Sequence, residues 1–306
     1  MNTLNALWSD NILMQSAGLP GQELPPGALY VVGVPIGNMG DITLRALWVL
    51  SRAEAVAAED TRETRKLLER FGIETRLLSV REHNERHGAE QIDELLSQGL
   101  RVALVTDAGT PAVSDPGARA VEHLRAAGRR IIPVPGPSAC VTALSAAGLR
   151  GAGFTFIGFL PPQPKARRQA LDALRERREP FVLYEAPHRI LALLNDMAEA
   201  LDGARGVVIA RELTKKFETV TAMTVADLPA FAAAHEPRGE YVLLVDEKPA
   251  EEGGLDPSDE AWLRDLAGEM PASRLAAIAA RRTGRPRQEI YAWLMKTREG
   301  TESEAQ

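Results

Sequence analysis

The sequence predicts an α/β fold of two lobes followed by a small C-terminal helical module. Short runs of β-branched and other apolar residues alternate with helical patterns, and this order is typical of a parallel sheet. The chain has 306 residues, which is more than a single hydrophobic core usually serves. A charged, glycine-containing segment, residues 248–257, then separates these elements from three further helical patterns and is predicted to be a linker.

The first lobe is expected over residues 27–150, after a leader, residues 1–26. The leader has no sustained period and contains three prolines near its end, so it is predicted to be flexible. Residues 29–34 form an apolar run that ends at Pro35 and Gly37, which predicts a buried strand followed by a loop. The same alternation predicts strands at 55–58, 101–106 and 131–134 and helices at 43–52, 61–71, 88–98 and 138–147.

The second lobe is expected over residues 151–247. Its predicted strands and helices alternate as in the first lobe, with strands at 154–159, 181–185, 206–210 and 241–245 and helices at 167–177, 188–201 and 225–234. The C-terminal module is expected over residues 258–298, where three short helical patterns occur. The last two are joined by a turn that contains Gly284, in the manner of a helix-turn-helix. Residues 299–306 are expected to form a tail.

Composition and charge narrow the classes of function. No run of 18 apolar residues exists, and the first residues lack the basic segment of a signal peptide; we therefore expect no membrane span and a cytoplasmic location. Cys140 is the single cysteine and is expected to be buried. His83 and His87 have no third histidine or cysteine nearby, so we predict no metal site. The net charge of −6 argues against a protein that coats nucleic acid non-specifically.

Three predicted loops of the first lobe meet at the carboxyl edge of its sheet. The loop at 33–38 carries two glycines that let backbone approach a ligand, but it lacks the dinucleotide-binding spacing, and a plain turn is the alternative. Asp107 ends a strand, where its carboxylate either binds a ligand or caps its own turn. Ser138 and Ala139 offer free backbone N–H groups at a helix start, where Ser138 is the expected N-cap. Together the loops predict a ligand pocket.

Polar residues follow three other strands. Glu59, Asp60 and Arg62 come after the strand at 55–58, and charged groups near a core are costly unless they are paired or functional. An ordinary capped helix start is the alternative interpretation. In the second lobe, strands end in Leu-Tyr-Glu-Ala-Pro-His-Arg at 183–189 and in Ala-Arg-Glu-Leu-Thr-Lys-Lys at 210–216. Two such polar ends seldom arise for packing alone.

Two stretches of the acidic chain are locally basic. Residues 163–189 contain seven Lys or Arg against four Asp or Glu, and residues 273–298 contain seven against one. We interpret these stretches as the RNA footprint. A solvated helix face is the alternative, and it explains the first stretch equally well because its charges are interleaved.

Six strings, in order between Tyr30 and Glu218, carry a resemblance to a known family. They read VGVPIGNMGDITLRAL, AAEDTRETRKLL, ALVTDAGTPAVSDPG, VPGPSA, LYEAPHR and ARELTKKFE. Together they resemble the ribosomal small subunit RNA methyltransferase I family, 16S rRNA cytidine 2′-O-methyltransferases of the tetrapyrrole methylase superfamily. The resemblance spans roughly Gly27 to Asp246, and the C-terminal module resembles the helix-turn-helix segment attached to members of this family.

The resemblance implies a two-lobed tetrapyrrole-methylase-like (class III) methyltransferase fold, distinct from the Rossmann type, that binds S-adenosyl-L-methionine between its lobes. It also implies a homodimer and, as partner, 16S rRNA within the small ribosomal subunit. Residues matched to the family's cofactor contacts are Ile36, Asp107, Thr110, Ser138, Ala139, Tyr184 and Leu213, with Glu185 as a further match. Two departures occur: Gly33-Val34 stands where Ala-Thr is usual, and Ala112-Val113 replaces a Gly-Ile pair.

A ribose hydroxyl is a poor nucleophile, so we expect a base near it and cations that grip phosphate. The candidate bases are Glu59, Asp60 and Glu185. The candidate phosphate contacts are Arg62, Arg189 and Lys215. Two alternatives stay open. One is a methyltransferase of the same superfamily that acts on a tetrapyrrole. The basic C-terminal module argues against this alternative. The other is a non-catalytic ribosome-binding factor that keeps the fold.

Overall fold

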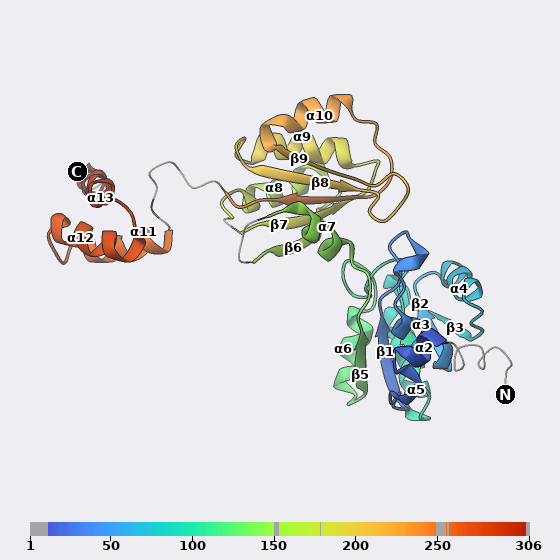
Figure 1. Cartoon of the computed structure of the whole chain (residues 1–306). Coiled ribbons are helices and arrows are strands. Elements are labelled where there is room, and N and C mark those ends of the chain that lie inside the picture. The colour runs from blue at the N-terminus through green and yellow to red at the C-terminus, as the bar shows by residue number, and fades with distance from the viewer. Residues whose placement is uncertain (1–11, 150–152, 178, 249–254, 256, 304–306) are drawn as a thin grey trace. The chain divides into compact units, whose positions relative to one another are not determined.

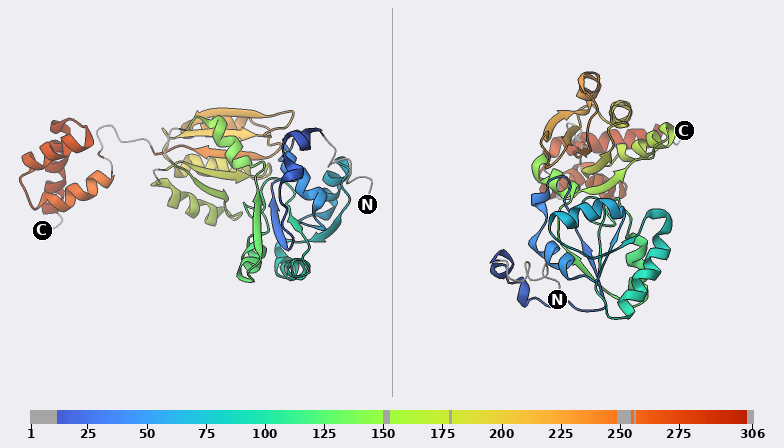
Figure 2. Two further views of the ribbon diagram at one scale, coloured as in Figure 1. Left: turned by 60° about the horizontal axis from the view of Figure 1, so that its bottom comes forward. Right: turned by 90° about the vertical axis from the view of Figure 1, so that its right-hand side faces the viewer.

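The computed structural model describes residues 12–149, 153–177, 179–248, 255 and 257–303. The chain divides into two compact units, residues 1–247 and 248–306 (Figures 1 and 2). The first unit contains two five-stranded sheets, and the second is the helical module. The division falls where the predicted linker begins.

The first sheet is parallel, with the strand order β3-β2-β4-β1-β5. Every residue of β2 and β4 is buried, as expected for parallel strands covered on both faces. Helices α3 and α4 pack on one face, and α5 and α6 on the other. The strands are β1 (Ala28–Val32), β2 (Ala55–Ala58), β3 (Arg76–Ser79), β4 (Val102–Leu104) and β5 (Arg130–Val134), and the helices are α3 (Leu44–Arg52), α4 (Thr61–Arg70), α5 (Glu85–Ser97) and α6 (Ala118–Ala126).

The second sheet is mixed, with the strand order β6-β7-β10-β8-β9. Only β6 and β7 pair in parallel; the other neighbours are antiparallel. Alternate side chains along β10 enter two different apolar clusters, because successive residues of a strand point to opposite faces. The strands are β6 (Thr155–Phe159), β7 (Phe181–Glu185), β8 (Gly206–Arg211), β9 (Thr219–Thr224) and β10 (Tyr241–Val245).

Helices cover both faces of this second sheet. The helices α8 (Pro164–Arg175), α9 (Ile190–Ala200) and α10 (Leu228–Ala234) bury their apolar sides against one face. The other face is covered by α7 (Ala139–Ala147), drawn in green in Figure 1, which packs against β10 and β9. Cys140, at the start of α7, is buried as predicted. The sequence assigned α7 to the first lobe, but its buried side chains belong to the core of the second.

The described part of the predicted leader is folded. Residues Ile12–Ser16 form the short helix α2, and Leu19–Gly21 form the 3-10 helix η1. Met14 and Leu19 are buried in the core of the first lobe, and Tyr30 Oη donates a hydrogen bond to Pro25 O at 2.9 Å. The expectation of a flexible leader is therefore wrong for residues 12–26, whose few apolar residues were too scattered to show a period. Residues 1–11 lie outside the described residues.

Besides α2 and the short 3-10 helices, three elements of the first unit were not predicted, for a common reason. The strands β3 and β9 each lie at an edge of their sheet, and most residues of β9 are exposed, so neither shows a continuous apolar run. The third element is α6, in which only Ala120 and Leu124 are buried. Sequence patterns are weakest where few side chains reach the core.

The second unit is a three-helix module with its own core. It consists of α11 (Pro257–Ala267), α12 (Ala272–Thr283) and α13 (Arg287–Ser303). Gly284 ends α12 with a φ of 71°, in the left-handed region where glycine is favoured. Helix α13 runs to residue 303, so the expected tail at 299–306 is helical over its described part. No helix of the described residues is long and apolar enough to cross a membrane.

Candidate active site

A cavity of about 270 Å³ lies in the first unit, where the ends of strands from both sheets meet. Six of the seven residues predicted to contact a cofactor line it: Ile36, Thr110, Ser138, Ala139, Tyr184 and Leu213. The seventh, Asp107, lines a neighbouring cavity of about 550 Å³ together with residues of α4. The sequence therefore predicted residues that gather from five separate segments of the chain.

The three loops of the first lobe are tied directly to one another. Val34 and Gly109 exchange backbone hydrogen bonds of 2.9 and 3.1 Å, and Thr110 Oγ1 donates to Pro137 O at 3.1 Å. Gly33 and Gly136 touch through their backbones, since a Cβ added to either glycine would lie 2.8 Å from the Cα of the other. Gly33 therefore allows the first loop to lie directly against the loop that contains Gly136.

The loop that follows β4 has an unusual backbone. Ala112 and Ser114 have φ angles of 67° and 62°, a left-handed conformation that costs a non-glycine residue about 1–2 kcal/mol. The buried carboxylate of Glu85, at the start of α5, holds the end of this loop. Its Oε1 accepts hydrogen bonds from the backbone nitrogens of Gly117, Arg119 and Ala120 at 2.8–3.1 Å. The sequence analysis did not single out Glu85.

Tyr184 connects β7 to the start of α7. Its Oη accepts a hydrogen bond from Cys140 N at 2.8 Å, and its ring makes edge contacts with Phe156 and Phe159. Burial raises the pKa of Tyr184 to about 12, so this phenol stays neutral at physiological pH. Ser138 is the N-cap of α7, as predicted, although its side chain makes no capping hydrogen bond.

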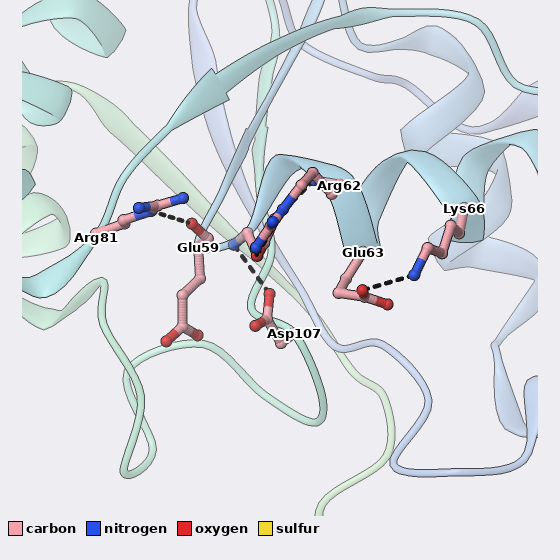
Figure 3. Close-up of polar contacts among 7 residues, drawn as sticks. Glu59, Arg62, Glu63, Lys66, Arg81 and Asp107 are labelled. Atoms are coloured by element: carbon pink, nitrogen blue, oxygen red, sulfur yellow. Dashed lines mark hydrogen bonds and ion pairs between the residues drawn. The ribbon is translucent and has the colours of Figure 1, made fainter.

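Glu59, Asp60 and Arg62 form a polar cluster at the end of β2, shown with their neighbours in Figure 3. Glu59 Oε2 accepts a hydrogen bond from Thr106 Oγ1 at 2.9 Å. Asp60 caps α4 through Arg62 N and forms an ion pair with the Arg62 guanidinium at 2.5 Å; this contact holds the Asp60 pKa well below its ordinary value. Asp60 N donates to Asp107 Oδ1 at 2.9 Å. The alternative of a capped helix start thus accounts for Asp60.

Glu185 and Arg189 form a buried ion pair beside the cavity. The Glu185 side chain is completely buried, and Arg189 Nε lies 3.1 Å from its Oε1. Arg189 Nη2 also donates to Leu160 O at 2.6 Å, so this cation is held inside the protein. Glu185 Oε2 is buried and has no hydrogen-bond partner in the described part of the chain. A buried acceptor without a partner is unfavourable unless a ligand supplies the donor.

Lys215 is likewise held by carboxylates. Its Nζ lies 2.8 Å from Glu212 Oε1 and 2.9 Å from Glu240 Oε2, and Glu240 lines the cavity. A Cβ added to Gly37 would lie 2.6 Å from the Lys215 side chain, so Lys215 lies over the first loop. Among the three cations predicted to grip phosphate, only Arg62 is largely exposed, with 81% of its side chain accessible.

Asp115 is a further carboxylate of the cavity wall that the sequence analysis did not single out. Its pKa is raised to about 6, mainly by burial and also by the nearby charges of Glu59 and Asp107, whereas Thr106 acts to lower it. In the sequence Asp115 stands in Ser-Asp-Pro-Gly, a pattern typical of an ordinary turn. Within the described residues, no three His, Cys, Asp or Glu side chains form a candidate metal site.

Comparisons with known proteins point to a methyltransferase family. The family model for Tetrapyrrole (Corrin/Porphyrin) Methylases matches residues 28–229, and the model for the RsmI C-terminal HTH domain matches residues 253–298. The Ribosomal RNA small subunit methyltransferase I of Neisseria meningitidis serogroup B is 46% identical over 271 residues, covering 87% of this chain and 92% of that protein. The protein of the same name from Escherichia coli O157:H7 is 44% identical and covers 88% and 95%.

Solved structures share the fold of this chain. The uroporphyrin-III-C-methyltransferase from Thermus thermophilus has a TM-score of 0.52 and 26% identity, and it covers 72% of this chain and 94% of its own. The methyltransferase CobJ has a TM-score of 0.56 and 21% identity, with coverage of 74% and 96%. These matches leave about a quarter of this chain without a counterpart.

Proposed function

Because this chain belongs to the tetrapyrrole methylase family and, within it, to the ribosomal RNA small subunit methyltransferase I family, we propose that it methylates a cytidine ribose of 16S ribosomal RNA at the 2′-hydroxyl. The observation that carries the proposal is the pairing, in one chain, of the methylase match with the C-terminal module match. Residues 273–298 of the module contain seven Lys or Arg against one Asp or Glu, and this local basic charge favours a nucleic-acid substrate over a tetrapyrrole.

We infer that the methyl donor is S-adenosylmethionine and that it binds in the cavity between the strand ends. The wall offers apolar side chains from Ile36, Leu213 and Val242 to a nucleoside. Glu185 Oε2, buried without a partner, fits an N–H donor of the ligand. When bound, this cofactor supplies an electrophilic methyl group on a sulfonium sulfur. The protein's main task is to align the hydroxyl with that group and to exclude water.

The proposed activity is tested by transfer of labelled methyl groups from S-adenosylmethionine to unmodified small ribosomal subunits and to free 16S RNA. We expect label in RNA with at least one of these substrates. Cofactor binding without transfer to either RNA would favour a tetrapyrrole substrate, and a tetrapyrrole methylation assay would then follow. Absence of cofactor binding would contradict an enzymatic role and favour a ribosome-binding factor.

The C-terminal module is the proposed RNA contact of the second unit. Arg274, Arg281, Arg282 and Arg287 are all exposed, but Arg282 lies over the Trp262 ring and Arg287 donates a hydrogen bond to Ser273 O. Arg274 and Arg281, whose side chains make no such contact within the described residues, are therefore the better candidates for phosphate contacts.

Reversing both charges, in R274E/R281E, is expected to weaken RNA binding by about tenfold or more. The slope of log Kd against log salt concentration should decrease by about 2, because about two phosphate contacts are lost. Fluorescence anisotropy with a labelled 16S fragment at several salt concentrations measures both. Arg125→Glu, an exposed arginine at the end of α6, is the matched control and should change neither. An unchanged salt slope in the double variant would contradict RNA contact by α12.

A homodimer is the proposed assembly. Val141 on α7, Val220 on β9 and Phe217, which precedes β9, are 61%, 42% and 64% exposed, and α7 packs beside β9. Apolar side chains gathered on a surface are typical of protein interfaces. Light scattering after gel filtration should give twice the chain mass for the wild type and the single mass for V141E/V220E. A monomeric wild type at micromolar concentration would contradict the dimer.

A further inference from the structure

Asp115 differs from the other carboxylates around the cavity in its electrostatic surroundings. Glu185 is paired with Arg189 and Glu240 with Lys215. No ion pair of Asp115 occurs among the described residues, and no cation contributes to its pKa shift. The residue is half-buried in the cavity wall, on the strained loop that Glu85 holds in place.

The groups that face Asp115 come from the ends of three strands. Thr106 and Asp107 follow β4, Glu59 follows β2, and Tyr184 lies on β7, where Asp115 contributes to raising its pKa. Thr106 Oγ1 donates a hydrogen bond to Glu59 Oε2 at 2.9 Å, and the same hydroxyl lowers the pKa of Asp115. The charged groups that act on Asp115 are therefore the carboxylates of Glu59 and Asp107, and the neutral Thr106 hydroxyl opposes them.

We propose that Asp115 is the general base of the reaction and that Thr106 and Glu59 tune its basicity. This inference rests on the proposed methylation of a ribose hydroxyl. In the step, Asp115 Oδ takes the proton of the 2′-hydroxyl while the new oxygen–carbon bond forms. The sulfur–carbon bond breaks and its electron pair stays on sulfur, so the sulfonium becomes a neutral thioether. The proton then leaves from the protonated Asp115 to water.

The surroundings give Asp115 the basicity that this role needs. A general base works best when its pKa lies near the working pH, and the pKa of Asp115 is raised to about 6. At neutral pH Asp115 is then ionised in most molecules, yet it is a stronger base than an ordinary aspartate. Asp60 is not suited to the role, because its ion pair with Arg62 holds its pKa low.

The first part of the test needs no substrate. In the free protein labelled with ¹³C at aspartate carboxyls, one resonance should titrate near pH 6 and be missing in D115N. In T106V this midpoint should rise, because the hydrogen bond that lowers the pKa is removed. In E59Q it should fall, because a like charge is removed. If Asp115 had only a structural role, the two variants would not shift its midpoint in opposite directions. A midpoint below about 4.5 in the wild type would overturn the proposal.

The second part measures single-turnover methyl transfer to RNA between pH 5 and 9. D115N should bind S-adenosylmethionine with wild-type affinity and lose about 10²- to 10⁴-fold in rate. In the wild type the rate should rise with pH through about 6, with the midpoint displaced upward in T106V and downward in E59Q. Asp172→Asn, an exposed aspartate of α8, is the control and should keep the wild-type rate and midpoint.

The outcomes separate this inference from the proposed function. If the wild type transfers methyl groups and D115N does so equally fast, Asp115 is not the base and the function stands. If E59Q loses the rate and D115N keeps it, Glu59 is the base instead. If the wild type transfers nothing to RNA, the function fails, and the titration of Asp115 is still measured.

Discussion

Replacing Gly136 with alanine is expected to abolish binding of S-adenosylmethionine. The added Cβ would lie 2.8 Å from both Cα and O of Gly33, and these are backbone atoms that cannot rotate away. The two loops must then separate, and Ser138 and Ala139, which follow Gly136 after Pro137, move with them. An ångström of displacement at a binding site is enough to cost about 100-fold, so we expect at least that loss of affinity by isothermal titration calorimetry.

Gly21→Ala is the matched control for this prediction, because nothing lies within 4 Å of a Cβ at Gly21. It should bind the cofactor as the wild type does. Gly33→Ala should reproduce the defect of Gly136→Ala, since the contact is mutual. Wild-type cofactor affinity in a folded Gly136→Ala protein would show that the close approach of the two loops is not needed for binding.

Replacing Arg189 with methionine is expected to lower the free energy of unfolding by about 3 kcal/mol or more. Arg189→Met keeps the length of the side chain but leaves the fully buried Glu185 carboxylate without its cation. Removing one member of a buried pair leaves an uncompensated charge, which is worse than removing both. The double variant E185Q/R189M should therefore be more stable than R189M alone. Urea unfolding of the full chain, followed by circular dichroism at an unchanged m-value, measures the difference.

The control is an ion pair of the same type on the surface. Lys66 and Glu63 on α4 are 71% and 54% exposed, and exposed pairs contribute about 0–1 kcal/mol. Lys66→Met should therefore change the unfolding free energy by less than about 1 kcal/mol. If Arg189→Met were equally mild, Glu185 would be neutral in the folded protein or paired with another group.

Much of the fold could be predicted because the buried strands have a clear local signature. The runs at β1, β2 and β10 are apolar throughout, so their positions follow from short continuous apolar segments. Edge strands such as β9 expose most of their residues and give no such signal. The antiparallel pairing within the second sheet also escaped prediction, since the order of strands along the chain does not specify their direction. Met14 was missed because a single buried side chain has no period.

The location of the candidate site was predicted better than the roles of its charged residues. Strand ends and glycine loops indicated a pocket, the family resemblance picked out Ile36, Thr110 and Ser138 in it, and the structure gathers these residues in one cavity. What each charged group does depends on partners from distant parts of the chain. Lys215 is held by two carboxylates, and Asp115 owes its raised pKa to burial and to residues at the ends of other strands. Contacts between residues far apart in the chain cannot be predicted from local sequence patterns.

The most direct test of the account is the identity of the methylated nucleoside. Small ribosomal subunits that lack the modification would be incubated with the protein and S-adenosylmethionine, and the 16S RNA would then be digested to nucleosides and examined by mass spectrometry. We expect one new species in which a cytidine carries the methyl group on its ribose. A methyl group on the base alone, or no methylated nucleoside under conditions where the cofactor binds, would contradict it.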